Sequence, residues 1–211
     1  GLRDRAERDG HARGAIPPGA LVLTLGVDVQ NDRVEWHLVG FGRDLRRWTI
    51  DYGVIEGHIT DTKCRTKLDA LMLREWPTAF GTCRRMELLA VDGGAWKTEV
   101  MDWARTHPQE KVIVTKGAKS DQAPEMVPIK EDRLPSGKII KYQRRFWHLG
   151  VSRLKSALYS NLRKVDPLER GFVAFPQGME DEFYRQLTAE RRVLVRTRQG
   201  YEEYHWVKDK N

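Results

Sequence analysis

Residues 23–33 read LTLGVDVQNDR, a β-prone run that contains one acid, Asp28, and ends in a polar turn. Two more β-prone runs follow after short polar connections, RVEWHLVGFG at residues 33–42 and RRWTIDYGVI at residues 46–55. Because short connections join antiparallel neighbours, the three runs predict an antiparallel meander. A carboxylate inside an apolar strand is costly unless a cation or hydrogen bonds compensate for it, so Asp28 is expected to have a partner.

The pattern then changes to alternating helices and strands. Residues 66–76 and 95–106 carry apolar side chains at helical spacing, and they are followed by apolar runs at residues 86–94 and 111–117. A three-strand meander followed by β/α units predicts an α/β fold, with a mixed sheet and helices on both faces. The apolar faces hold three tryptophans that are expected in the core, Trp36, Trp76 and Trp103.

The second half of the chain is less regular. Residues 117–145 are polar and contain three prolines, which predicts an excursion with a small hairpin around residues 134–138. Residues 150–165 predict a helix, with its apolar face formed by Val151, Leu154, Leu158 and Leu162. A strand at 171–176, a helix at 179–191 and a C-terminal hairpin at 191–208 complete the expected elements.

The ends of the chain set the expected domain boundaries. Residues 1–20 are rich in Arg, Gly and Asp and end in AIPPGA, a composition typical of a linker. Residues 21–211 are expected to form one globular domain, because no internal repeat or second linker interrupts them.

The composition of the chain indicates which kinds of binding partner and cellular compartment are expected. The chain has 37 Lys and Arg against 30 Asp and Glu, which gives a net charge of +7 and favours a polyanion such as nucleic acid. Cys64 and Cys83 have neither zinc-site spacing nor a disulfide pattern, which indicates a reducing compartment. No apolar run has the roughly 20 residues that span a bilayer, so we expect a soluble intracellular protein with no membrane partner.

Two acids lie at strand ends. Asp28 is in the first strand, and Asp92 ends the apolar run LLAVD before Gly-Gly. If the two strands are neighbours, the carboxylates meet and repel each other, which implies a cation between them. Oxygen ligands without Cys or His suit Mg²⁺ or Mn²⁺. Taken singly, Asp28 is better explained by an arginine partner and Asp92 by capping of the next helix, whereas the two acids together in this topology favour the cation.

Six ordered segments carry a resemblance to a known family. They are TLGVDVQNDRVEWHLVGFG, WTIDYGVIEG, LLAVDGGAWKTEVMDWAR, VIVTKGAK, FWHLGVSRLKSALYSNL and GFVAFPQGMEDEFYRQLTAER. Together they resemble the nuclease domain of large terminase subunits of the lambda GpA type from tailed phages, from about Leu21 onward. The topology with an acid on the first and the fourth strand is typical of ribonuclease-H-like nucleases, which use two divalent cations.

The resemblance implies a function. Asp28 and Asp92 would be metal-binding catalytic acids of an endonuclease that cuts concatemeric phage DNA at the start and end of packaging. The expected partners are double-stranded DNA, a small terminase subunit, the portal and an N-terminal ATPase motor, in the cytoplasm of a bacterial host. No G-x-x-x-x-G-K-[ST] occurs, so residues 1–20 would be the tether to a motor that this chain lacks.

The chain departs from the family pattern at two places. The family's third acid follows the last hairpin, and here it would lie near or beyond Asn211. A helix start that reads G-V-D in relatives is G-V-S here, so Ser152 supplies no acid. Glu180, Asp181 and Glu182 are substitutes within the chain, although acids in the first turn of a helix are also explained by the helix dipole.

Basic residues predict contacts with the DNA backbone. Lys116 and Lys119 follow the fifth strand, and Lys155 lies on the helix at 150–165; each is also explained as a solvated surface charge. Two clusters are expected to attract DNA diffusely, Lys141, Arg144 and Arg145, and Arg191, Arg192, Arg196 and Arg198.

Two other functions fit the same sequence. One is a resolvase-like or transposase-like strand-transfer enzyme, which would prefer junctions or specific ends to plain duplex. The other is a non-catalytic module that holds DNA, which would keep the basic face and lose nothing when the acids are removed. The sequence leaves open whether cutting is site-specific or headful.

Overall fold

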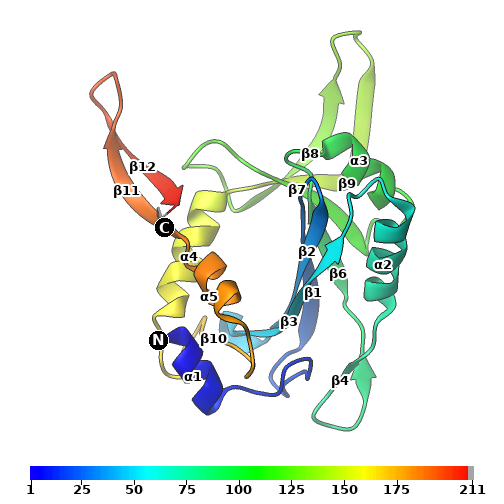
Figure 1. Cartoon of the computed structure of the whole chain (residues 1–211). Coiled ribbons are helices and arrows are strands. Elements are labelled where there is room, and N and C mark those ends of the chain that lie inside the picture. Colours follow the sequence, from blue (N-terminus) through cyan, green and yellow to red (C-terminus); the bar gives the residue numbers. More distant parts are fainter. Residues whose placement is uncertain (209–211) are drawn as a thin grey trace.

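The computed structural model describes residues 1–208, and its centre is an eight-stranded mixed sheet with the strand order β10-β3-β2-β1-β6-β7-β9-β8. Figure 1 shows α2 and α3 on one side of this sheet and α1, α4 and α5 on the other. The predicted α/β class and mixed sheet are confirmed. No helix in this part of the chain has the length and apolar character needed to cross a membrane.

The meander forms as predicted. β1 (Val22–Val29) pairs antiparallel with β2 (Arg33–Phe41), and β2 pairs antiparallel with β3 (Arg47–Glu56). A single 3₁₀ turn, η1 (Arg43–Leu45), connects the second and third strands. Side chains alternate between buried and more exposed positions along β2, as expected for a strand with two different faces.

Two β/α units follow. The helix α2 (Thr62–Leu73) precedes β6 (Leu88–Asp92), and α3 (Lys97–Ala104) precedes β7 (Val112–Gly117). β6 pairs in parallel with β1 on one side and with β7 on the other, so β1 and β6 are neighbours.

The predicted helix at 66–76 is wrong at its C-terminal end. α2 stops at Leu73, and the chain forms a separate two-stranded sheet from β4 (Trp76–Pro77) and β5 (Cys83–Arg84). The residue before a proline avoids the helical region, which explains why the helix does not extend through Trp76.

The polar excursion is a long hairpin rather than a small one. β8 (Met126–Arg133) pairs antiparallel with β9 (Ile139–Leu149), and the turn lies at residues 134–138 as predicted. β9 also pairs in parallel with β7, so β9 and β8 are the last two strands of the main sheet.

The last elements match the predicted order. They are α4 (Val151–Leu162), β10 (Val173–Ala174), α5 (Asp181–Leu187), β11 (Glu190–Arg196) and β12 (Glu202–Lys208). β11 and β12 form the predicted C-terminal hairpin, which is a separate two-stranded sheet.

Two clusters of buried side chains hold the layers together. The larger one fills the space between the sheet and α2 and α3, and it includes Trp36, Trp76 and Trp103 as predicted. The smaller one lies under α1, α4 and α5 and consists of Ala6, Leu162, Val173, Phe175, Met179, Phe183 and Tyr184. Of the apolar face predicted for α4, only Leu162 is buried, and Leu154 is 39% exposed, because α4 packs on this small peripheral cluster.

The segment predicted as a linker contains folded structure. α1 (Leu2–Asp9) contributes Ala6 to the smaller cluster, and Ile16 is buried in the larger one. The guanidinium of Arg5 donates hydrogen bonds to the carbonyl oxygens of Lys164 (2.5 Å) and Val173 (2.8 Å). Residues 1–20 are therefore packed on the domain, while their expected role as a tether to a motor stays a prediction.

Candidate functional site

The two acids of the sequence pattern lie on adjacent strands at the same level. The parallel register pairs Val27 of β1 with Val91 of β6, so Asp28 and Asp92 are the next residues on the two strands. Val27 and Val91 are buried on the α2 and α3 side, and alternation places both acids on the opposite face, towards α5.

The surroundings of the acids exclude the two simpler explanations. Within residues 1–208 Asp28 has no arginine partner; its Oδ2 accepts a hydrogen bond from the amide of Gln30. Asp92 Oδ1 accepts a hydrogen bond from the backbone N–H of Gly94 (3.0 Å), and the N-cap of α3 is Trp96. Neither acid is therefore explained by an ion pair with arginine or by helix capping.

The electrostatics confirm that the acids influence each other. Burial raises the pKa of the Asp92 carboxyl, the Gly94 N–H lowers it, and the negative charge of Asp28 raises it again. The nearby ammonium of Lys116 lowers the same pKa. The net direction is upward, so the site holds Asp92 in a position where an additional positive charge would stabilise its ionised form.

Both acids open into a pocket of about 460 Å³ between the sheet and α5. Its walls include Glu35 and His37 of β2, Tyr52 of β3 and Phe183 of α5. Apart from the acids and a few polar groups the walls are apolar, which is typical of a ligand-binding site.

Glu35 and His37 were not singled out from the sequence. Glu35 is the direct cross-strand partner of Asp28, and its carboxylate accepts a hydrogen bond from Arg33 Nε (2.7 Å). Burial lowers the pKa of His37 to about 4, so its imidazole is neutral at pH 7, and its Nε2 lies 3.0 Å from Thr49 Oγ1. The sequence feature that could have identified these two residues is the alternation in RVEWHLV. It places Glu35 and His37 on the face of β2 opposite to Trp36.

Within the described residues, the acids do not form a complete set of ligands for a metal ion. Residues 1–208 contain no group of three or more His, Cys, Asp or Glu side chains placed to hold one ion. The third acid that the resemblance implies, near or beyond Asn211, lies outside the described residues. Asp28 and Asp92 remain the pair of oxygen ligands that these residues offer.

The acids at the start of α5 are occupied elsewhere. Glu180 accepts hydrogen bonds from Tyr52 and Arg13, and Asp181 forms an ion pair with Arg3 (2.7 Å). Glu182 forms an ion pair with Arg185 (2.9 Å) in the same helix. These contacts support a structural role for all three acids.

The three lysines predicted to bind DNA have different surroundings. Lys116 follows Thr115, the partner of Asp92 on β7, and its charge lowers the pKa of Asp92. Lys119 and Lys155 line a second pocket of about 640 Å³ next to the C-terminal hairpin. Lys155 forms an ion pair with Glu190 and lies 5.9 Å from the ring centroid of Trp206, so it fixes the base of that hairpin.

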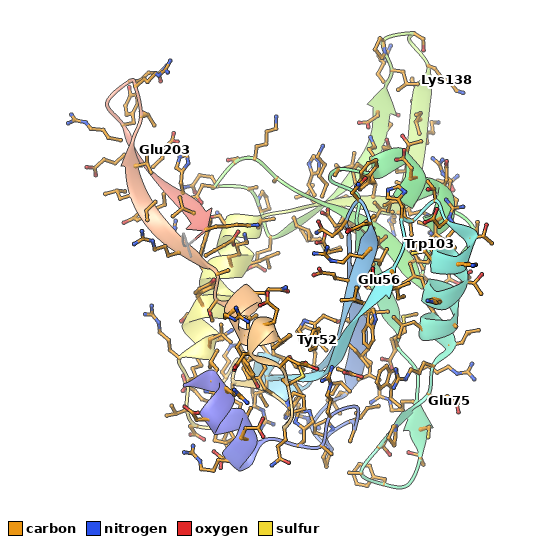
Figure 2. All side chains as sticks on the ribbon, viewed as in Figure 1. Tyr52, Glu56, Glu75, Trp103, Lys138 and Glu203 are labelled. Carbon is orange, nitrogen blue, oxygen red and sulfur yellow. The ribbon has the colours of Figure 1, made fainter. Side chains whose placement is uncertain are left out.

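α5, which covers the pocket, is fastened to the sheet by a cluster of charged groups. Figure 2 shows Tyr52 between the sheet and α5, where its hydroxyl donates to Glu180 Oε2 (2.5 Å). Arg13 donates to Asp51 Oδ1 (2.7 Å) and to Glu180 Oε1 (3.0 Å), so it connects the N-terminal segment, β3 and α5. The Tyr52 hydrogen bond and the Arg13 contacts lower the pKa of Glu180 to about 2.

This low pKa predicts a pH-dependent contribution to stability. A carboxyl with a depressed pKa in the folded state stabilises the fold above its unfolded pKa, near 4.5, and this contribution is lost as the pH falls towards about 2. We expect Glu180→Gln to lower the free energy of unfolding at pH 7 by less than about 1 kcal/mol, because the side chain is largely exposed. Urea denaturation at pH 7 and pH 3 would show a smaller difference at pH 3. An equal difference at both pH values would contradict the assignment.

Comparisons with known proteins identify the family of the chain. The model of the family described as terminase large subunit gpA, endonuclease domain, matches residues 1–211. The chain is 27% identical over 197 residues to the large terminase subunit of Escherichia phage lambda. The aligned region covers 89% of this chain and 29% of that protein. The chain thus spans less than a third of that curated relative, and no solved structure matches it significantly. The match over the full length shows that the chain belongs to the family of endonuclease domains of terminase large subunits of the gpA type.

Proposed function

We propose that this chain is a metal-dependent DNA endonuclease domain that cuts concatemeric phage DNA at the initiation and termination of genome packaging. The observation that carries the proposal is the pair Asp28 and Asp92, on one level of neighbouring parallel strands and at the edge of one pocket. Membership of the endonuclease family supports it. A ribonuclease-H-like fold is part of the same proposal, supported by the meander followed by β/α units.

The chemistry of the two side chains fits a hard divalent cation. Asp28 and Asp92 offer only oxygen atoms. Burial and, to a smaller extent, the charge of Asp28 raise the pKa of Asp92, and a bound cation would lower it. We propose that Asp28 and Asp92 would together hold two Mg²⁺ or Mn²⁺ ions. When bound, such ions make water more acidic and neutralise negative charge that develops on the phosphate.

The residues around the acids position them for this task. The amide of Gln30 holds one oxygen of Asp28, which leaves the other free to face a ligand. Gly94 holds Asp92 through its N–H, and a side chain at Gly93 would come within 2.6 Å of Val114 Cγ1. Gly93 therefore allows the chain after Asp92 to pass close to Val114 of β7.

Lys116 is the basic residue best placed to contact a bound phosphate. It is the lysine among Lys116, Lys119 and Lys155 whose charge acts on Asp92. Lys119 lies farther along the same loop, at the second pocket, where it is available to the DNA backbone. The ion pair of Lys155 with Glu190 argues for a supporting role in the hairpin.

The other partners of the proposal come from the family. In the full-length protein we expect an N-terminal ATPase motor, and we expect a small terminase subunit and the portal to bring the domain to its cutting sites in the bacterial cytoplasm. Those partners would decide between site-specific and headful cutting.

The proposal is tested by nicking of supercoiled plasmid with Mn²⁺, with Mg²⁺ and with EDTA. We expect metal-dependent conversion to the open circular form, because the two acids need a cation to act on a phosphodiester. Activity that appears only in a chain extended past Asn211 would place the third acid there. Absence of cleavage in both chains, with retained DNA binding, would overturn the proposal and favour a module that only holds DNA; preference for junctions would favour strand transfer.

A further inference from the structure

The hairpin of β8 and β9 extends far beyond the body of the domain. In Figure 1 it projects upward from the sheet, and Figure 2 places Lys138 at its outer end. We define residues 130–144 as the basic arm. They include the end of β8, the turn and the first part of β9.

The basic arm carries an excess of free positive charge. It holds two acids and five basic side chains, Lys130, Arg133, Lys138, Lys141 and Arg144. None of the five forms an ion pair with an acid in residues 1–208, whereas Asp132 is already held by Lys97 of α3. The C-terminal hairpin differs, because its Arg192 is held by Asp121 (3.1 Å) and its outer strand begins with Glu202 and Glu203.

The base of the arm is held firmly. The carboxylate of Asp132 accepts hydrogen bonds from both Lys97 and the hydroxyl of Tyr142 (2.7 Å). Arg145 donates to the carbonyl oxygens of Ala104 (2.7 Å), Val112 (2.9 Å) and His107 (2.9 Å), so its guanidinium connects the base of the arm to the segment between α3 and β7.

A bulge in β9 lies between residues 146–149, which pair with β7, and residues 139–141 at the outer end of the hairpin. The pairing shifts register between Ile129 and Glu131, opposite residues 141–146 of β9. Gln143 and Arg144 have φ values of 49° and 64°, a conformation uncommon for residues other than glycine. The indole of Trp147 donates to the carbonyl oxygen of Arg144 (2.7 Å) and holds this bend. Bulges of this kind redirect the strand beyond them.

We propose that the basic arm binds the phosphate backbone of duplex DNA at a distance from the acids. The inference rests on the proposed function, which makes DNA the substrate. A two-stranded ribbon has the width that the major groove admits, and unpaired Lys and Arg side chains are the groups that neutralise phosphates. Ile139 and Leu149 pair with the two ends of the eight-residue strand β8, so the outer end of β9 lies up to about 25 Å from Leu149, or roughly seven base pairs along a duplex.

The proposed contact is independent of DNA sequence. Phosphates are the same at every step of the duplex, so cations that reach only phosphates fix the position of the protein without reading bases. The arm would thus hold the duplex on one side of the cut while Asp28 and Asp92 act on the strand.

The test compares two double variants that remove equal charge. The first variant combines Lys138→Gln and Lys141→Gln and alters the arm. The second combines Lys63→Gln and Lys67→Gln, at exposed positions of α2, on the face of the sheet opposite to the acids. Binding of a 30-base-pair duplex is followed by fluorescence anisotropy in EDTA at several salt concentrations. We expect the arm variant to bind on the order of tenfold more weakly, with a salt dependence smaller by about two phosphate contacts, and the α2 variant to bind like the unaltered chain.

Equal affinities of the two variants would overturn the proposal. A loss that appears with one DNA sequence and not with another would also contradict it, because phosphate contacts are shared by all sequences. Since EDTA removes any metal-dependent cleavage, the binding result is independent of nuclease activity. A chain that binds through the arm and does not cut would retain this inference and reject the proposed function.

Discussion

Asp28→Asn and Asp92→Asn are each expected to lower metal-dependent nicking by on the order of 10³-fold or more while leaving the metal-free fold at least as stable. Loss of activity follows because an amide cannot replace the charge that a divalent cation needs, and several kcal/mol of transition-state stabilisation are then lost. Stability is retained because burial and the charge of Asp28 both raise the pKa of Asp92, so the ionised pair is unfavourable without a cation.

The measurement is the initial rate of plasmid nicking in Mn²⁺ beside the thermal midpoint in EDTA. Asp102→Asn is the matched control, because Asp102 is an exposed acid of α3 that pairs with Arg105 (3.7 Å). We expect it to nick at the rate of the unaltered chain. If either site variant retained most of the activity, the acid pair would not be the catalytic centre; if both lost activity through unfolding, the thermal midpoint would reveal it.

The sequence predicted the strands that carry these acids because their pattern is local. The meander needs only short polar turns between β-prone runs, and β6 and β7 are apolar runs bounded by helices with clear periodicity. The order of the units did not by itself make β1 and β6 neighbours, because the chain after β3 crosses over β2 and β1 before β6 joins the sheet. The other acid at the pocket, Glu35, was harder to predict, because it becomes a cross-strand partner of Asp28 only through the register of β1 and β2.

Contacts between distant segments could not be predicted in this way. Arg13 lies in a segment with the composition of a linker, yet it connects β3 to α5 through partners 38 and 167 residues away. The parallel pairing of β9 with β7 likewise depends on the packing of the whole sheet. In the sequence, Lys155 and Arg145 cannot be distinguished from charged residues on the surface that have no partner. Only the fold shows that Lys155 pairs with Glu190 and that Arg145 donates to the carbonyl oxygen of Ala104.

Trp103→Ala is expected to cause a large loss of stability, about 3 to 5 kcal/mol in the free energy of unfolding. Trp103 is 1% exposed, and it packs between α3 and the sheet in the larger buried cluster (Figure 2). Its indole N–H donates to Asp69 Oδ1 (3.0 Å), which connects α3 to α2. Removing the ring leaves a cavity and deprives Asp69 of one donor.

We expect the substitution to lower nicking activity as well, because α3 begins only five residues after Asp92. Of the four residues between them, only Trp96 has a long side chain that can hold the turn in place. Urea denaturation at pH 7 measures the stability, and nicking below the denaturation midpoint measures the effect on Asp92. Trp103→Phe is the control that keeps most of the buried area without the hydrogen bond, and we expect it to lose less than half as much. If the alanine variant lost less than about 1 kcal/mol, α3 would not depend on this contact, since filling of a buried cavity by relaxation rarely recovers so much.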